Sequence, residues 1–265
     1  MQKTIFITGA TDGIGLETSK LLASKGAKLL LHGRNQEKLE SVAQAIREAF
    51  PSAHVEVYLA DLQKLEDVKA LISQVRQAHK KLDVLINNAG VFNVAEVHTK
   101  EGYDVRFIVN TVAPYLLTQG LWELLKGGRV VNLSSAAQSS VDLEAMLGKR
   151  AVEDMAAYAQ SKLALTMWSR VLGGKGGNGP LVVAVNPGSL LGSKMVKSAF
   201  GVEGGDLNIG ASILVEAALS ESFEKASGLY FDNDKGRFAS PHLDAMHAEK
   251  CQAVINAIEA ICRAS

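Results

Sequence analysis

Tyr158 and Lys162 lie four residues apart in a stretch whose pattern predicts a helix. Side chains at this spacing stack on one face of a helix, so the phenol would lie beside a positive charge. A neighbouring cation favours the phenolate and lowers a tyrosine pKa from its usual value near ~10. The pair is therefore a candidate acid/base centre for proton transfer near neutral pH. Such spacing also arises by chance, and the alternative is a solvated tyrosine beside a solvated lysine.

Composition and charge narrow the class of protein. The chain has 265 residues, 47% of them apolar, which suffices for one large α/β core, so we expect residues 1–265 to form a single domain. Its 28 acidic residues balance 28 lysines and arginines, so no net charge favours nucleic acid or an anionic membrane. The expected partner is a small-molecule substrate, and no nucleic acid.

The cysteines and apolar runs predict a cytoplasmic protein, and the histidines predict no metal site. In one predicted helix Cys251 and Cys262 would lie roughly 16 Å apart, beyond disulfide reach. No apolar run is long enough to span a bilayer, and the apolar residues 5–7 meet a glycine turn too early for a signal peptide. His242 and His247 would lie on different helix faces, with no cysteine or carboxylate cluster beside them. We therefore expect no membrane span and no metal site.

The order of apolar runs predicts an α/β fold. Short β-branched or aliphatic runs alternate with longer amphipathic segments, which is typical of repeated β-α units. About seven strands are expected, at 4–8, 28–32, 54–59, 84–87, 129–133, 181–186 and 229–231. Helices are expected at 13–25, 36–49, 63–79, 102–125, 152–172, 208–220 and 244–262. These elements predict a Rossmann-type, doubly wound parallel sheet flanked by helices, with Asn35 capping the second helix and Gly26 ending the first.

A glycine-rich turn joins the first strand to the first helix. Glycines let a backbone approach a pyrophosphate closely, and the amides at the helix start stabilise its charge. The candidate dinucleotide-binding residues are Gly9, Thr11, Asp12, Gly13, Ile14 and Gly15. The spacing Gly-x-x-x-Gly-x-Gly differs from the Gly-x-Gly-x-x-Gly fingerprint, and a purely structural turn is the alternative.

The end of the second strand indicates which dinucleotide is used. An NAD enzyme would present an acid there, but this chain has Arg34 followed by Asn35. A planar guanidinium is well suited to a 2′-phosphate, so NADP(H) is favoured over NAD(H), with both residues as candidate contacts. The alternative is an ordinary solvated arginine beside a helix start.

Further motifs follow the expected elements in order. They are Thr8-Gly9-x-x-x-Gly13-x-Gly15, Asp61-Leu62, Asn87-Asn88-Ala89-Gly90, Asn110, Ser134-Ser135, Tyr158-x-x-x-Lys162 and Pro187-Gly188. Each is weak alone, but together they resemble the short-chain dehydrogenase/reductase family across most of the chain. The resemblance implies a nicotinamide-dependent oxidoreductase. It further implies cofactor contacts at Asp61, Leu62, Asn88, Ala89, Gly90, Tyr158, Lys162, Pro187 and Gly188.

The same resemblance implies a catalytic set of Asn110, Ser135, Tyr158 and Lys162. Tyr158 would exchange a proton with the substrate oxygen as hydride moves to or from the nicotinamide, and Ser135 would hold that oxygen. Lys162 would lower the tyrosine pKa and grip the nicotinamide ribose, while Asn110 would hold a water-linked proton path to the lysine. The alternatives are a polar helix residue for Asn110, turn chemistry for the serines and a solvated charge for Lys162.

Two segments form the expected substrate region. The stretch at 136–157 is longer than in the shortest family members and looks more like the retinol-dehydrogenase and carbonyl-reductase type. In the stretch at 189–210, Ser189 and Ser193 replace the usual threonine spacing, which leaves open the hydroxyl that meets the nicotinamide carboxamide. The glycines at 201–205 would suit a mobile cover. Residues that would line an apolar pocket or else fill the core are Met146, Leu147, Leu190, Leu191, Met195 and Phe200.

Together these features predict an NADP(H)-dependent reductase or dehydrogenase acting on a carbonyl/alcohol pair of a small apolar molecule. One alternative is a redox sensor that binds NADP(H) without turnover, although the catalytic tyrosine and lysine are both present. Another is a sugar-nucleotide epimerase or dehydratase, although the chain after residue 187 is short for the substrate domain of those enzymes. The resemblance also implies a homodimer or homotetramer paired through the helices that carry Asn110 and Tyr158.

Overall fold

The computed structural model describes residues 2–264, without the side chains of residues 199 and 200. It contains an eight-stranded sheet in the order β3-β2-β1-β4-β5-β6-β7-β8. The strands are β1 (Thr4–Ile7), β2 (Lys28–Gly33), β3 (Val55–Leu59), β4 (Val84–Asn87), β5 (Arg129–Leu133), β6 (Leu181–Asn186), β7 (Tyr230–Asp232) and β8 (Arg237–Ala239). Neighbouring strands are parallel except β7 and β8, which pair antiparallel. The strand order reverses between β1 and β4, where open α/β sheets form a ligand crevice.

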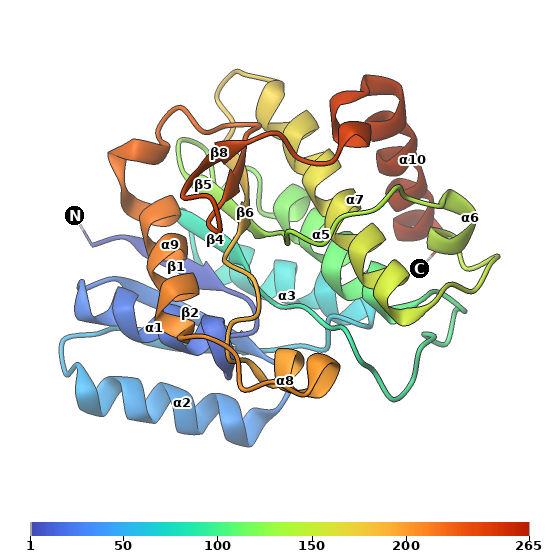
Figure 1. The fold of residues 1–265 in the computed structure, drawn as a ribbon. Coiled ribbons are helices and arrows are strands. Elements are labelled where there is room, and N and C mark those ends of the chain that lie inside the picture. Colours follow the sequence, from blue (N-terminus) through green and yellow to red (C-terminus); the bar gives the residue numbers. More distant parts are fainter. Residues whose placement is uncertain (1, 265) are drawn as a thin grey trace.

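Helices cover both faces of the sheet (Figure 1). One face carries α1 (Gly13–Ser24), α2 (Gln36–Ala49) and α9 (Leu207–Leu219). The other carries α3 (Leu65–Ala78), α5 (Ala113–Gly120), α7 (Asp154–Gly174) and α10 (Ala248–Ala264). The shorter elements are α4 (Val105–Phe107), the π-helix η1 (Ile108–Val112), α6 (Leu143–Met146), α8 (Lys194–Phe200) and the 3₁₀ turns η2 (Glu221–Phe223) and η3 (Leu243–Met246).

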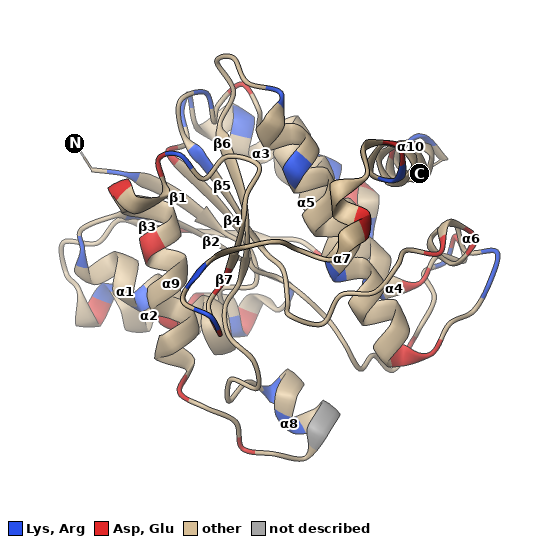
Figure 2. Ribbon diagram, turned by 45° about the horizontal axis from the view of Figure 1, so that its top comes forward, with Lys and Arg blue, Asp and Glu red and all other residues tan. Residues whose placement is uncertain are grey.

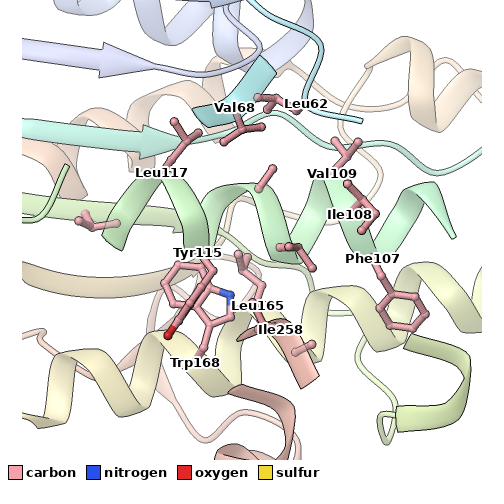
Figure 3. Close-up of a cluster of buried hydrophobic side chains, with 14 of the residues drawn as sticks. Leu62, Val68, Phe107, Ile108, Val109, Tyr115, Leu117, Leu165, Trp168 and Ile258 are labelled. Carbon is pink, nitrogen blue, oxygen red and sulfur yellow. The ribbon is translucent and has the colours of Figure 1, made fainter. Parts of the chain in front are cut away.

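Alternating side chains of the central strands hold the two helical layers. In β1, Ile5 and Ile7 belong to the apolar cluster that includes α1, α2 and α9, whereas Phe6 belongs to the cluster on the other face. Successive strand residues point to opposite faces, so a strand covered on both sides needs consecutive apolar residues. Figure 3 shows part of the second cluster, where Tyr115 and Trp168 meet edge to face with ring centroids 5.6 Å apart. The core therefore consists of two clusters divided by the sheet.

The fold class and all seven expected strands are confirmed, but several elements differ from the sequence-based expectation. Strand β8 was not expected, because its three residues are exposed or half-buried and show no apolar run. The helix expected at 102–125 is instead α4, the π-helix and α5, which ends at Gly120. The helix expected at 244–262 begins as η3 and continues as α10. Helices α6 and α8 are too short to show a helical period in the sequence.

Local signals at two helix ends are confirmed. The Asn35 side chain accepts a hydrogen bond from the backbone N–H of Lys38 at 2.9 Å, which caps α2. Gly26 follows the end of α1 with a φ of 76°, a left-handed conformation that glycine adopts without strain.

Charged residues of both signs are interspersed over the elements (Figure 2). The chain has 28 acidic residues and 28 lysines and arginines, so its formal net charge is zero. Among residues 2–264, no helix combines the length and apolar character needed to cross a membrane.

The buried guanidinium of Arg106 contacts both helical segments that carry the expected catalytic residues: it pairs with the buried Asp104 of its own segment and with the exposed Asp154 of the other. Arg106 in α4 is fully buried and donates to the Asp104 carboxylate at 2.9 Å and 2.6 Å, and also to Asp154 at the start of α7. Arg106 lies one turn before Asn110 in the chain, and Asp154 lies one turn before Tyr158. The guanidinium therefore sets how the Asn110 segment lies against the Tyr158 helix.

Replacing Arg106 with methionine should lower the free energy of unfolding by about 3–5 kcal/mol, because Asp104 is then left as a buried charge without its partner. Urea unfolding followed by circular dichroism measures this loss. Lys126→Ala is the control, since it breaks an exposed pair with Glu123 and should change stability by less than ~1 kcal/mol. An equally small change for Arg106→Met would show that the buried pair with Asp104 does not stabilise the fold.

Candidate active site

A cavity of about 780 Å³ opens at the carboxyl ends of the parallel strands. Its walls come from the loops after β1, β2, β3, β4, β5 and β6, and from α7 and α8. The expected site residues that line it are Gly9, Thr11, Asp12, Gly13, Ile14, Arg34, Asn35, Asp61, Leu62, Asn88, Ala89, Gly90, Ser135, Tyr158, Lys162, Pro187 and Gly188. Gly15 and Asn110 are buried and do not line it.

The glycine turn after β1 is packed tightly against the loop after β4. Gly9 has a φ of 65°, and a Cβ added there would lie 2.9 Å from Ala89 Cα. At Gly15 an added Cβ would lie 2.3 Å from Asn88 Nδ2, which already donates to the Gly9 carbonyl at 3.0 Å. Gly15 thus serves close packing of α1 beneath the turn, whereas Gly13, at the first position of α1, lines the cavity. The tight turn and the start of α1 together bring backbone amides to the cavity wall, as pyrophosphate binding requires.

His32 holds this turn from below. Its Nε2 lies 3.1 Å from the Ala60 carbonyl, which can only accept, so Nε2 carries the proton and Nδ1 accepts from the Gly9 N–H at 3.3 Å. Burial lowers the pKa of His32 to about 4, so the ring is neutral at neutral pH. The sequence offered no signal for this role, because the histidine meets Gly9 and Ala60 only in the folded sheet.

Protonating His32 should destabilise the protein in acid. Its folded pKa lies below the unfolded value of 6.5, so the unfolded state binds more protons between these values and stability falls as the pH drops from 6.5 towards 4. The contribution is on the order of 3 kcal/mol, because one pKa unit corresponds to ~1.4 kcal/mol. Urea unfolding at pH 7 and pH 4.5 should show a smaller loss for His32→Gln than for the parent. The exposed His54→Gln control should keep the parent's loss, and an unchanged loss in His32→Gln would contradict the assignment.

Basic side chains stand at the end of the cavity formed by β2 and β3. Arg34 and Lys38 line it, are both exposed, and have no ion-pair partner among residues 2–264. Asp61 lines the same end, and its carboxylate accepts from the backbone N–H of Gln63 at 3.1 Å. Lys38 was missed by the sequence reasoning, although its position one turn into α2 from Arg34 could have indicated it. Two cations at one end suit a phosphate group.

Lys162 is buried at the other end of the cavity. Its side chain is 4% exposed, and its Nζ donates to the Leu133 carbonyl at 2.8 Å. Burial lowers the pKa of Lys162 to about 8, so it loses its charge at a lower pH than a solvated lysine. A Cβ added at Gly90 would lie 3.4 Å from Nζ, so the glycine leaves room for the ammonium.

The structure corrects the expected pKa of Tyr158. Burial raises the pKa of this phenol, and hydrogen bonding with the Ser135 side chain opposes that rise only in part. Lys162 Nζ lies 5.7 Å from the centroid of the tyrosine ring, and no lowering by the lysine is seen. The physical reason is that the helix brings both groups into the same buried place, where the charged form of each is disfavoured.

Asn110 lies within the π-helix, between the cavity wall and α7. Its Oδ1 accepts from the Val91 N–H at 2.8 Å, and its Nδ2 donates to the Val91 carbonyl at 2.9 Å and to Ser161 Oγ at 2.9 Å. Both amide protons are used, so one acceptor position on Oδ1 is left for a water. The residue therefore pins the loop after β4 to α7, and an added Cβ at Gly90 would lie 3.5 Å from its Oδ1.

The expected substrate segments contribute unevenly to the cavity. Leu190, Leu191 and Met195 line it. Met146 does not, because it is fully buried in the core, and Leu147 packs against that core. The Phe200 side chain lies outside the described part of the chain. Other residues of the two expected segments that line the cavity include Met155, Lys194, Val196 and Ser198, and Phe92 and Asn93 line it from the loop after β4, where no substrate contact was expected.

Two of these residues have contacts across the site. Phe92 meets the Tyr158 ring edge to face with centroids 5.1 Å apart. Lys194, at the start of α8, forms an ion pair with Asp12, the residue that caps α1. Among residues 2–264, no group of three or more histidines, cysteines or acids could hold a metal ion.

Comparison with known proteins agrees with this geometry. The family described as short chain dehydrogenase matches residues 3–202. The chain belongs to the short-chain dehydrogenase family. Its relatives in this family include human retinol dehydrogenase 13, 30% identical over 263 residues that cover 91% of this chain and 80% of the relative. Mouse retinol dehydrogenase 12 is 34% identical over 253 residues, covering 90% of this chain and 80% of the relative.

Solved structures of other proteins have the same fold. An uncharacterized protein from Mycobacterium paratuberculosis superposes with a TM-score of 0.80 at 27% identity, covering 99% of this chain and 94% of its own. A short chain dehydrogenase from Escherichia coli CFT073, complexed with NADPH, superposes with a TM-score of 0.71 at 28% identity. The match covers 87% of this chain and 96% of the other. The family membership places the chain among oxidoreductases, a family whose members bind a nicotinamide cofactor.

Proposed function

We propose that this protein transfers a hydride between NADP(H) and the carbonyl/alcohol pair of a small apolar substrate, with Tyr158 as the general acid/base. One observation carries the proposal: Ser135, Tyr158 and Lys162 converge at one end of the cavity, and Arg34 and Lys38 stand at its other end. A dinucleotide laid across the carboxyl edge of the sheet would reach both ends. The bound nicotinamide would supply or accept the hydride.

The protein's own side chains would handle the proton. Tyr158 holds it on Oη, and the raised pKa keeps the phenol protonated at neutral pH, which suits donation to a carbonyl oxygen. Ser135 would hold that same oxygen by a hydrogen bond and stabilise its developing charge. Lys162, whose pKa of about 8 lies near neutrality, would help to replace the proton on the tyrosine. Asn110 would add the water-linked end of this path.

Replacing Tyr158 with phenylalanine should lower kcat by about 10²–10⁴, because the proton donor is lost while the ring and its contact with Phe92 remain. Steady-state oxidation of NADPH with a panel of aldehydes, ketones and quinones measures this change. NADPH affinity, measured by fluorescence, should stay within about twofold of the parent.

Tyr103→Phe is the matched control, since Tyr103 packs against the core away from the cavity and should keep the parent rate. A Tyr158→Phe protein that works at the parent rate would overturn the mechanism. If the parent binds NADPH but oxidises it with no substrate of the panel, a redox sensor without turnover becomes the better reading.

The preference for NADP(H) is proposed from Arg34 and Lys38. Arg34→Asp should lower the ratio of kcat/KM for NADPH over NADH by about 10- to 100-fold, because a charged hydrogen bond of about 1.5–3 kcal/mol is lost and repulsion replaces it. Lys38→Ala should lower the ratio in the same direction by a smaller factor. Lys20→Ala, on the exposed side of α1, is the control. An unchanged ratio in Arg34→Asp would remove the assignment.

An apolar substrate is proposed from the cavity wall around Tyr158. Phe92 packs against the Tyr158 ring, and Met155, Leu190, Met195 and Val196 line the same cavity. Apolar side chains with a few convergent polar groups are typical of sites for small molecules. The names of the two retinol dehydrogenase relatives point in the same direction. Retinoid-like aldehydes therefore belong in the substrate panel beside smaller apolar ones.

A further inference from the structure

The turn between β7 and β8 contacts the loop that follows β6. The Asp234 carboxylate accepts hydrogen bonds from the backbone N–H of Ser189 at 2.8 Å and from its hydroxyl at 2.6 Å. It also accepts one from the Asn186 side chain at 2.9 Å. Beside it, the Asn233 side chain donates to the Pro187 carbonyl at 2.9 Å. These hydrogen bonds tie the hairpin turn to residues 186–189, which line the cavity next to Tyr158.

The loop after β6 contains backbone conformations that only its surrounding contacts can maintain. Gly188 has a φ of 124°, and Leu190 has a φ of 52°, which is strained for a leucine. Such a conformation persists only where the surrounding contacts over-determine it. On one side the Leu190 carbonyl accepts from the Gly205 N–H at 2.8 Å. On the other side the contact with Asp234 holds Ser189.

The contact with Asp234 also shows what the Ser189 hydroxyl does: it donates its hydrogen bond to this carboxylate. A serine has one O–H donor, and in Ser189 that donor is directed at the carboxylate. Ser193 differs, because its oxygen accepts from the Val196 N–H at the start of α8 and its O–H is not used in that bond. Of the two hydroxyls, Ser189 therefore serves to shape the loop.

The same hairpin holds a second wall of the site. Tyr230 in β7 donates its hydroxyl to the Ser135 carbonyl at 3.1 Å. Ser135 and residues 187–189 both line the end of the cavity that holds Tyr158. Strands β7 and β8 thus support both sides of the place where a hydride would be transferred.

We propose that Asp234 is a positioning residue for the nicotinamide half of the cofactor, acting through residues 186–189. The inference rests on the proposed function, which lays NADP(H) along the cavity with its nicotinamide beside Tyr158. Asp234 does not line the cavity, so its effect reaches the ligand only through the loop. The adenosine half would lie on the loops after β1, β2 and β3, which this contact does not touch.

The test compares NADPH with 2′,5′-ADP, which contains only the adenosine half. Dissociation constants are measured by isothermal titration calorimetry for the parent and for Asp234→Ala. The variant should bind NADPH about tenfold more weakly, equivalent to about 1.4 kcal/mol, and 2′,5′-ADP within about twofold of the parent. Asp234 is exposed, so its removal leaves the fold intact, which circular dichroism checks. Asp234→Asn keeps one acceptor and should give an intermediate loss.

Lys235→Ala is the matched control. Lys235 lies in the same turn, but its ammonium pairs with Asp232 and not with the loop, so both affinities should match the parent. If Asp234→Ala binds NADPH as tightly as the parent, or loses both ligands equally, the positioning role is overturned. A parent protein that binds neither ligand overturns the proposed function itself, and this inference with it.

A second variant tests the route through Ser189. If Asp234 acts through this residue, Ser189→Ala and Asp234→Ala should not add, and the double variant should bind NADPH about as weakly as Asp234→Ala alone. Losses that add fully would overturn the route.

Discussion

Parallel strands all end on one edge of their sheet, and the whole site depends on this constraint. In this protein the loops after β1 to β6 meet along that edge, in the spatial order β3-β2-β1-β4-β5-β6. Residues separated by well over a hundred positions, such as Arg34 and Pro187, therefore line one cavity. The strand order reverses between β1 and β4, where the glycine turn at Gly9 packs on Ala89.

The second organising feature is the burial of ionisable groups at one end of this cavity. Taking Lys162 out of water disfavours its charge, and the Leu133 carbonyl compensates with one hydrogen bond. Tyr158 is held nearby, and burial keeps its proton on the phenol. The proposed proton transfer rests on these two properties, the lowered pKa of Lys162 and the protonated phenol of Tyr158. Both pKa shifts come from burial of ordinary side chains, so no unusual residue type is needed.

Much of the fold and the site could be predicted from the sequence. Particular residues show which features could not be predicted. The apolar runs of β1 and β2 are read directly, because a strand buried on both faces has no other composition. The cavity residues after these strands follow from their place at strand ends. Lys194 could not be predicted in the same way, since it reaches the site through the packing of α8 near the start of α1, where it pairs with Asp12. Lys38 and Phe92 lie close in sequence to expected site residues, but only the fold shows that their side chains line the cavity. Met146 carried no signal to separate core from pocket.

The sequence by itself determined the order of the strands β1 to β7 along the chain, the position of the glycine turn and the pairing of Tyr158 with Lys162 on one helix. These are local properties, set by side-chain period and by backbone freedom over a few residues. Only the tertiary structure decided the direction of the Tyr158 pKa, the neutral state of His32 and the support that Asp234 gives to the loop after β6. Each depends on burial or on hydrogen bonds between distant segments, and a folded chain alone brings those groups together.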